Sequence, residues 1–275
     1  MNFWYWFVST GWLYIMVGIG IFTAIWLAVH WKKTDWLNRL GAIAIIVLVL
    51  HVIEEWVLPG GFHYIYNVGS ATPDRYPMNQ LSDMITNFGA AIVGLIVLLK
   101  FGFNKASGIA ISIFSLFETV IHIVLAAKSL NAFSSAGQTT FYAPGLMTGI
   151  FCFLPLAVTY ILFFVFNKDK PKIKSWAGGL LALAVLSFLL VNLPEMLLKN
   201  ENSPYVFTYH GWYEQFINGT AVTGMSGGTI ASIIVGCLLI ACAAGGCIYY
   251  FGIKKKKLAH LNAYFKDKFN IAEVE

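Results

Sequence analysis

Charged residues are scarce in this chain. Only 11% of its 275 residues are Asp, Glu, Lys or Arg, whereas 58% are hydrophobic and 16% are aromatic. A soluble domain carries about 25% charged residues, and the mean hydropathy of this chain is strongly positive, at +0.71. The composition therefore excludes a soluble globular domain and predicts an integral, multi-pass membrane protein. The net charge of +5 belongs to expected loops and does not indicate a nucleic-acid partner.

Cysteine is also rare, and the four residues show no CxxC or other metal-type spacing. All four fall inside apolar segments, so we interpret them as small packing residues rather than as metal ligands or disulfide partners. They are Cys152, Cys237, Cys242 and Cys247. The N-terminus, MNFWYWFVSTGW, lacks a basic region and a small-residue cleavage site, so a signal peptide is not expected.

Apolar runs long enough to cross a bilayer, which needs roughly 20 residues, recur along the chain. They predict an all-α fold, a single bundle of seven transmembrane helices over residues 1–252, followed by a basic cytoplasmic tail at 253–275. The expected spans are 10–31, 36–58, 81–101, 106–128, 142–166, 176–198 and 225–252.

The distribution of Lys and Arg predicts the orientation. With the N-terminus outside and the C-terminus inside, the inner segments hold fifteen basic residues and the outer segments only three, namely Arg75, Lys128 and Lys199. The basic tail is expected to contact anionic lipids. The longer outer loops, 59–80, 129–141 and 199–224, are rich in aromatic residues. They are either interface anchors or a cap over a cleft, and His63 and His210 are expected to be ordinary loop residues.

Three costly polar residues, His51, Glu54 and Glu55, end the second expected span in the run LVLHVIEEW. An ionisable group in the middle of a membrane costs roughly 2.5–3.5 kcal/mol on the insertion scale. Spacings of three and four residues put these side chains on one helix face. Mutual pairing or a bound cation is the natural way to offset their burial.

Other spans carry polar residues at similar depth, in the outer half. The fourth span has Glu118 and His122 four residues apart, on one face. The further polar or helix-breaking residues on the outer side are Asn79, Asp83 and Asn87 of the third span, Tyr142, Pro144, Gly145 and Thr148 of the fifth, and Asn192 and Glu195 of the sixth. This clustering predicts one site shared by several helices, with Glu195 open to it if Pro194 breaks the helix.

These residues resemble a known family. HVIEE at 51–55, a second histidine at His122 and the YAPG run at 142–145 agree in order and spacing with the HXXEE family of predicted integral-membrane enzymes. The similarity covers roughly residues 36–165. It implies an enzyme but supplies no substrate, because the family has no assigned reaction.

Imidazole and carboxylate groups are ligands for Zn²⁺ and also for iron or manganese. We predict His51, Glu118 and His122 as metal ligands, with Glu55 as a fourth ligand or as support. Zinc is favoured, and a di-iron site is less so, because the order of the H-x-x-E spacing is reversed relative to such bundles. Glu54 would be the general base that takes a proton from activated water.

The candidate catalytic residues are Glu54, Glu55, Tyr142 and Asn87. The favoured reaction is metal-dependent hydrolysis or acyl transfer on a lipid or lipid-linked substrate. Alternatives are a metal-free acid–base isomerase, similar to membrane sterol isomerases of the emopamil-binding type, a lipid or small-molecule binding or transport protein, and a polar network that serves packing alone. A proton path is disfavoured, because the inner half has almost no ionisable residue. Small residues such as Gly236, Gly245 and Gly246 permit close helix contact without identifying an oligomer.

Overall fold

The structure is a computed structural model that describes residues 2–217. These residues form an all-α membrane protein in which six helical segments are long and apolar enough to cross a bilayer. The segments are Phe3–Lys33, Trp36–Trp56, Gln80–Phe101, Lys105–Ala136, Leu146–Phe166 and Ile173–Leu198. The seventh expected span, the basic tail and the last three cysteines lie outside the described residues.

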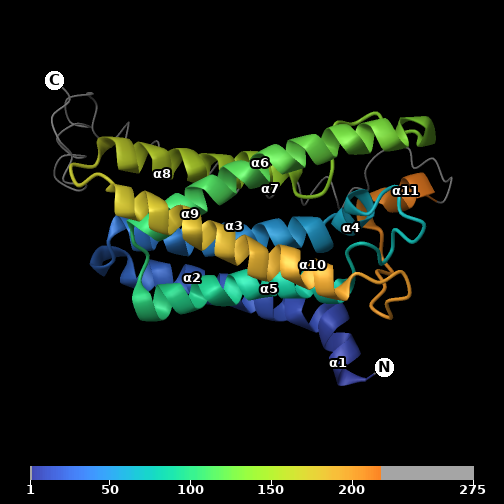
Figure 1. Ribbon diagram of the computed structural model, residues 1–275, viewed down its shortest axis with the longest axis horizontal. Coiled ribbons are helices and arrows are strands. Elements are labelled where there is room, and N and C mark those ends of the chain that lie inside the picture. Colours follow the sequence, from blue (N-terminus) through green and yellow to red (C-terminus); the bar gives the residue numbers. More distant parts are fainter. Residues whose placement is uncertain (1, 218–275) are drawn as a thin grey trace.

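The long helices lie side by side along the molecule (Figure 1). Several of the membrane segments contain a π-helical turn. Where this turn lies inside a segment, the segment is divided into two separately labelled helices. The elements are α1 (Phe3–Trp6), α2 (Trp12–His30), α3 (Trp36–Trp56), α4 (Phe62–Tyr66), α5 (Gln80–Ile96), α6 (Lys105–Phe133), α7 (Leu146–Thr148), α8 (Leu154–Phe166), α9 (Ile173–Ser187), α10 (Leu193–Leu198) and α11 (Glu214–Ile217). The π-helical turns are Phe7–Gly11, Val97–Phe101, Gly149–Phe153 and Phe188–Asn192.

Two expected spans began at the wrong residue. The first helical segment begins at Phe3 rather than near residue 10, because the aromatic N-terminus continues the helix after Asn2 caps it. The fifth begins at Leu146 rather than at 142, because Gly145 just before it has a φ of +94°, which lies outside the helical range.

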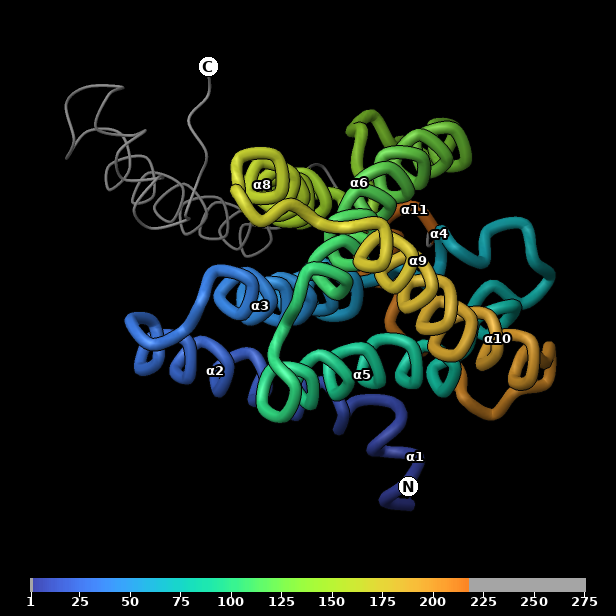
Figure 2. The backbone as a smooth tube through the Cα atoms, turned by 60° about the vertical axis from the view of Figure 1, so that its left-hand side comes forward, coloured from blue at the N-terminus to red at the C-terminus, as the bar shows by residue number. Residues whose placement is uncertain are grey.

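Helix α3 lies between α2 and α6, in the interior of the bundle (Figure 2). Ile45, Val49 and Val52 of α3 belong to an apolar core with residues of α2. Leu40 and Val47 belong to a second core with residues of α6 and α8. Both sides of α3 are therefore covered by protein, so the polar residues near its end are buried rather than exposed to lipid.

The segments 57–79 and 199–217 pack over one end of the helices as an ordered cap, near the N-terminus (Figure 1). The side chain of Asn67 bonds the backbone of Pro73 and Met78. Gly61 and the backbone of His210 are so close that a Cβ at Gly61 would lie 2.1 Å from the His210 oxygen. Two of the three longer outer loops therefore form a cap over the helix ends.

His63 is not an ordinary loop residue, and that prediction is wrong. It lies in α4 with only 1% of its surface exposed, and its ring stacks on those of Trp56 and Phe207. Neither of its ring nitrogens has a hydrogen-bond partner among the described residues. Burial and the neighbouring His210 hold the pKa of His63 well below its ordinary value.

Candidate metal centre

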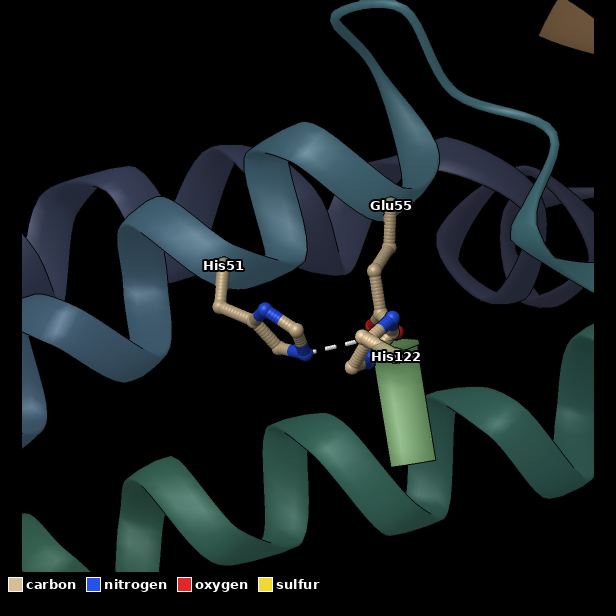
Figure 3. Close-up of side chains that lie close together, drawn as sticks. All are labelled: His51, Glu55 and His122. Carbon is tan, nitrogen blue, oxygen red and sulfur yellow. Dashed lines mark ion pairs between the residues drawn. The ribbon is translucent and has the colours of Figure 1, made fainter. Parts of the chain in front are cut away.

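Helices α3 and α6 bring two histidines and a carboxylate together beneath the cap. Nε2 of His51 and Nε2 of His122 each lie 3.3 Å from Oε1 of Glu55. The potential ligand atoms of all three residues lie within 4.8 Å of one another, and all three are buried. Figure 3 shows the three side chains pointing toward one another.

Glu118 adds a second carboxylate to this group. Its Oε2 lies 3.6 Å from Nε2 of His51 and 3.5 Å from Nε2 of His122. The side chain of Glu118 is 16% exposed, whereas that of Glu55 is 5% exposed. Glu118 therefore lies on the more open side of the cluster, and Glu55 on the closed side.

A backbone carbonyl fixes the protonation of the His122 ring. Nδ1 of His122 lies 3.0 Å from the carbonyl oxygen of Pro144. A carbonyl can only accept a hydrogen bond, so Nδ1 carries the proton. In the neutral ring, the lone pair of Nε2 then points into the cluster.

A hydroxyl does the same for His51. Nδ1 of His51 lies 2.7 Å from Oγ1 of Thr148. That hydroxyl donates to Oε2 of Glu54 at 2.6 Å, so it can only accept from the ring. Nδ1 of His51 is therefore protonated as well, and in the neutral ring its Nε2 also presents a lone pair to the cluster.

Glu54 faces away from the cluster, toward the start of α7. Its two oxygens accept hydrogen bonds from the Tyr142 hydroxyl at 3.0 Å, the Met147 and Thr148 backbone N–H groups at 3.0 and 2.8 Å, and the Thr148 hydroxyl. A carboxylate at a helix N-terminus is stabilised by such donors. This arrangement does not favour Glu54 as the general base, since four donors already occupy its oxygens.

The YAPG run supports the same centre. Tyr142 donates to Glu54, and burial together with that carboxylate raises the pKa of Tyr142 well above its ordinary value. The backbone carbonyl of Pro144 accepts a hydrogen bond from the His122 ring. A Cβ at Gly145 would lie 2.1 Å from Cε1 of His122, so only glycine leaves room for the ring.

Other predicted residues lie nearby but bind elsewhere. Asn87 donates to Asp83 at 2.7 Å within α5, and Asp83 is 2% exposed. Glu195 accepts from the Tyr66 hydroxyl of the cap at 2.7 Å. Asn79 caps α5. Among the described residues, neither Asn87 nor Asn79 forms a hydrogen bond with a member of the four-residue cluster.

The geometry of the cluster fits a divalent cation. Charge-assisted N–H···O bonds are usually about 2.7–2.9 Å long, and the four N···O separations here, 3.3–3.6 Å, are longer. Neighbouring ligands around a tetrahedral ion, with ligand distances near 2.0–2.1 Å, lie roughly 3.3–3.4 Å apart. In neutral rings the Nε2 lone pairs would face carboxylate oxygens, and a cation bound between them would remove this repulsion.

Aromatic rings lie beside both histidines of the cluster. The ring of Phe153 lies 5.0 Å from that of His51, and the ring of Phe62, in the cap, lies 5.5 Å from that of His122. Apolar surroundings of this kind limit the access of water and strengthen the electrostatic interactions inside.

The sequence predicts Thr148 on the outer side but does not indicate a function for it. The structure shows that it joins His51 to Glu54. Its position three residues after Gly145 was the only signal, and spacing alone cannot show which helix a hydroxyl faces.

Comparison with known families confirms the resemblance. Residues 42–160 match the model of the family described as "Protein of unknown function with HXXEE motif". Comparisons with curated proteins and with solved structures give no significant match.

Proposed function

We propose that this HXXEE protein is a membrane enzyme that binds one divalent metal ion, with zinc favoured and iron or manganese as alternatives. His51, His122 and Glu55 would hold the ion. The observation that carries the proposal is the locked orientation of both rings. Each Nδ1–H is engaged outside the cluster, while both Nε2 atoms approach the same oxygen of Glu55.

Each residue then has a distinct part. A bound divalent ion supplies Lewis-acid chemistry, polarising a carbonyl or phosphoryl group or activating water. Glu118 is the more open carboxylate, so it is the group that accepts a proton from the attacking nucleophile or completes the ligand set. Glu54, Thr148 and Tyr142 position the His51 side of the site and do not touch the reacting atoms.

The favoured reaction is hydrolysis or acyl transfer on a lipid or lipid-linked substrate. The residues beside the site on the outer faces of its helices support this choice, since Leu50 is 43% exposed and Phe117 is 61% exposed. In a membrane such faces meet acyl chains, so an amphiphile could reach Glu118 laterally.

Metal analysis of the purified protein tests the centre. We expect about one equivalent of metal per chain in the wild type, and less than about a tenth in His51→Gln or His122→Gln. His30→Gln is the matched control, because the His30 side chain bonds the Trp26 carbonyl and stacks on the Trp26 ring within its own helix, away from the cluster. Wild-type protein that gains no metal from added Zn²⁺, Fe²⁺ or Mn²⁺ would contradict the proposal and leave the acid–base alternative.

The same measurement tests the position of Thr148. Thr148→Val keeps the side-chain shape but removes the acceptor for His51 Nδ1–H, so metal affinity should fall by roughly 10–100-fold. Thr159→Val is the control, because the Thr159 hydroxyl only donates to Pro155 within its own helix. Equal metal affinity in the two variants would show that the hydroxyl does not orient the ring.

Lipid mass spectrometry of cells that express the wild type or Glu118→Gln tests the reaction. A modified lipid present only with the wild type supports an enzyme. Unmodified lipid that is redistributed between the leaflets supports transport instead.

A further inference from the structure

A second feature lies at the opposite end of the helices from the cap. A hollow of about 730 Å³ lies where α2 meets α3. Its wall is formed by Ala24, Leu27, Ala28 and Val29 of α2 and Ile46 of α3, and its rim by Trp31, Lys32 and Lys33 of the turn that follows α2. It therefore belongs to different residues from the metal centre.

The two parts of the hollow differ in chemistry. The wall is entirely aliphatic and runs along α2 from Ala24 to Val29, a rise of about 8 Å at 1.5 Å per residue. The rim carries two lysines with exposed side chains. Among residues 2–217, no ion pair joins either lysine to a carboxylate.

A third positive charge borders the rim. The guanidinium group of Arg39 lies 4.7 Å from the ring of Trp31 and 4.8 Å from that of Trp36. The nearest acidic residue in the sequence is Asp35, and its carboxylate accepts two hydrogen bonds from Asn38. Three basic groups and one engaged carboxylate leave this rim positively charged.

We infer that this hollow binds one anionic phospholipid. The upper part of an acyl chain lies against the aliphatic wall, where it replaces contact with other lipid chains. The phosphate lies at Lys32 and Lys33, since basic pockets between membrane helices favour anionic head groups. Trp31 stands at the boundary between the two, as aromatic residues do at membrane interfaces. This site is independent of the proposed reaction.

Native mass spectrometry of the full chain, purified in detergent with phosphatidylglycerol or phosphatidylcholine added, tests the inference. The wild type should retain one phosphatidylglycerol in preference to phosphatidylcholine. The double variant Lys32→Gln/Lys33→Gln should bind it roughly 25-fold more weakly, at about a factor of five for each basic residue.

A matched control separates a site from general surface charge. Lys100→Gln/Lys168→Gln removes two charges from residues that do not line the hollow, and it should keep wild-type retention. A second variant, Ala28→Phe, fills the aliphatic wall without changing the charge and should also weaken retention. Equal loss in both lysine double variants, equal retention of the two lipids, or unchanged retention in Ala28→Phe would each overturn the inference.

Discussion

The two histidines of the centre are held by different kinds of group. His51 depends on a side-chain hydroxyl, that of Thr148, whereas His122 depends on the backbone carbonyl of Pro144. A side-chain contact can be removed by one substitution, but a carbonyl can only be moved. The orientation of His122 therefore depends on the backbone conformation of the YAPG run, and above all on its glycine.

Gly145→Ala should abolish metal binding. The new Cβ would lie 2.1 Å from His122 Cε1, and the φ of +94° would be strained as well, at a cost on the order of 1–3 kcal/mol. Gly137→Ala is a matched control, since Gly137 has a φ of +98° and nothing within 4 Å of its Cβ position. The Gly137→Ala variant therefore introduces the backbone strain but no clash of the new Cβ with a neighbouring side chain.

Thermal unfolding and metal analysis of both variants separate these effects. We expect both alanine variants to unfold at lower temperature than the wild type, and only Gly145→Ala to lose its metal. Normal metal content in Gly145→Ala would show that the backbone can move without releasing His122.

For single residues, the sequence predicts which side chains lie close together better than it predicts the hydrogen-bond partners of each one. The spacing of His51 and Glu55, and that of Glu118 and His122, placed each pair on one helix face, and the structure brings the four residues together. The direction of Glu54 could not be predicted. It follows His51 by three residues, yet it faces α7, and only the packing of α7 against α3 decides this.

At the scale of elements, the cap was the least predictable part. Its conformation depends on contacts between segments more than a hundred residues apart, such as the backbone hydrogen bond from Trp212 to Gly60. Aromatic residues in such segments are equally typical of interface anchoring. The helices, by contrast, follow from long apolar runs, so their existence was predictable even where their first residues were not.

The buried ring of His63 should make the cap sensitive to acid. Its pKa is lowered from 6.5 in the folded cap, so the folded state binds fewer protons than the open state. The contribution of His63 to the stability of the folded cap is constant at pH values above its ordinary pKa. This contribution is lost as the pH falls below about 6.5, by up to roughly 1.4 kcal/mol per pH unit.

Hydrogen exchange of cap peptides that include Phe62–Tyr66 measures this effect. At about pH 5.5 the wild type should exchange faster, relative to neutral pH, than His63→Phe, which keeps a ring against Trp56 and Phe207 without a titrating group. The same acid response in both proteins would assign the sensitivity to another residue.

On the scale of the whole molecule, the cap and the centre lie at one end of the helices, and most of the basic residues lie at the other. Among the described residues, the end opposite the cap carries nine Lys and Arg residues and the cap end three. The positive-inside rule therefore predicts that the cap lies outside the cytoplasm. In this orientation a substrate would reach Glu118 from the outer leaflet, and the lipid hollow would face the inner leaflet.

Labelling with a membrane-impermeant maleimide tests this orientation in intact cells. Ser135→Cys places a thiol on the exposed turn after α6, at the cap end, and Lys170→Cys places one on the exposed loop between α8 and α9, at the opposite end. The unsubstituted chain gives the background from its own cysteines. We expect Ser135→Cys to label in intact cells and Lys170→Cys only after permeabilisation, and the reverse pattern would place the cap and the metal centre on the cytoplasmic side.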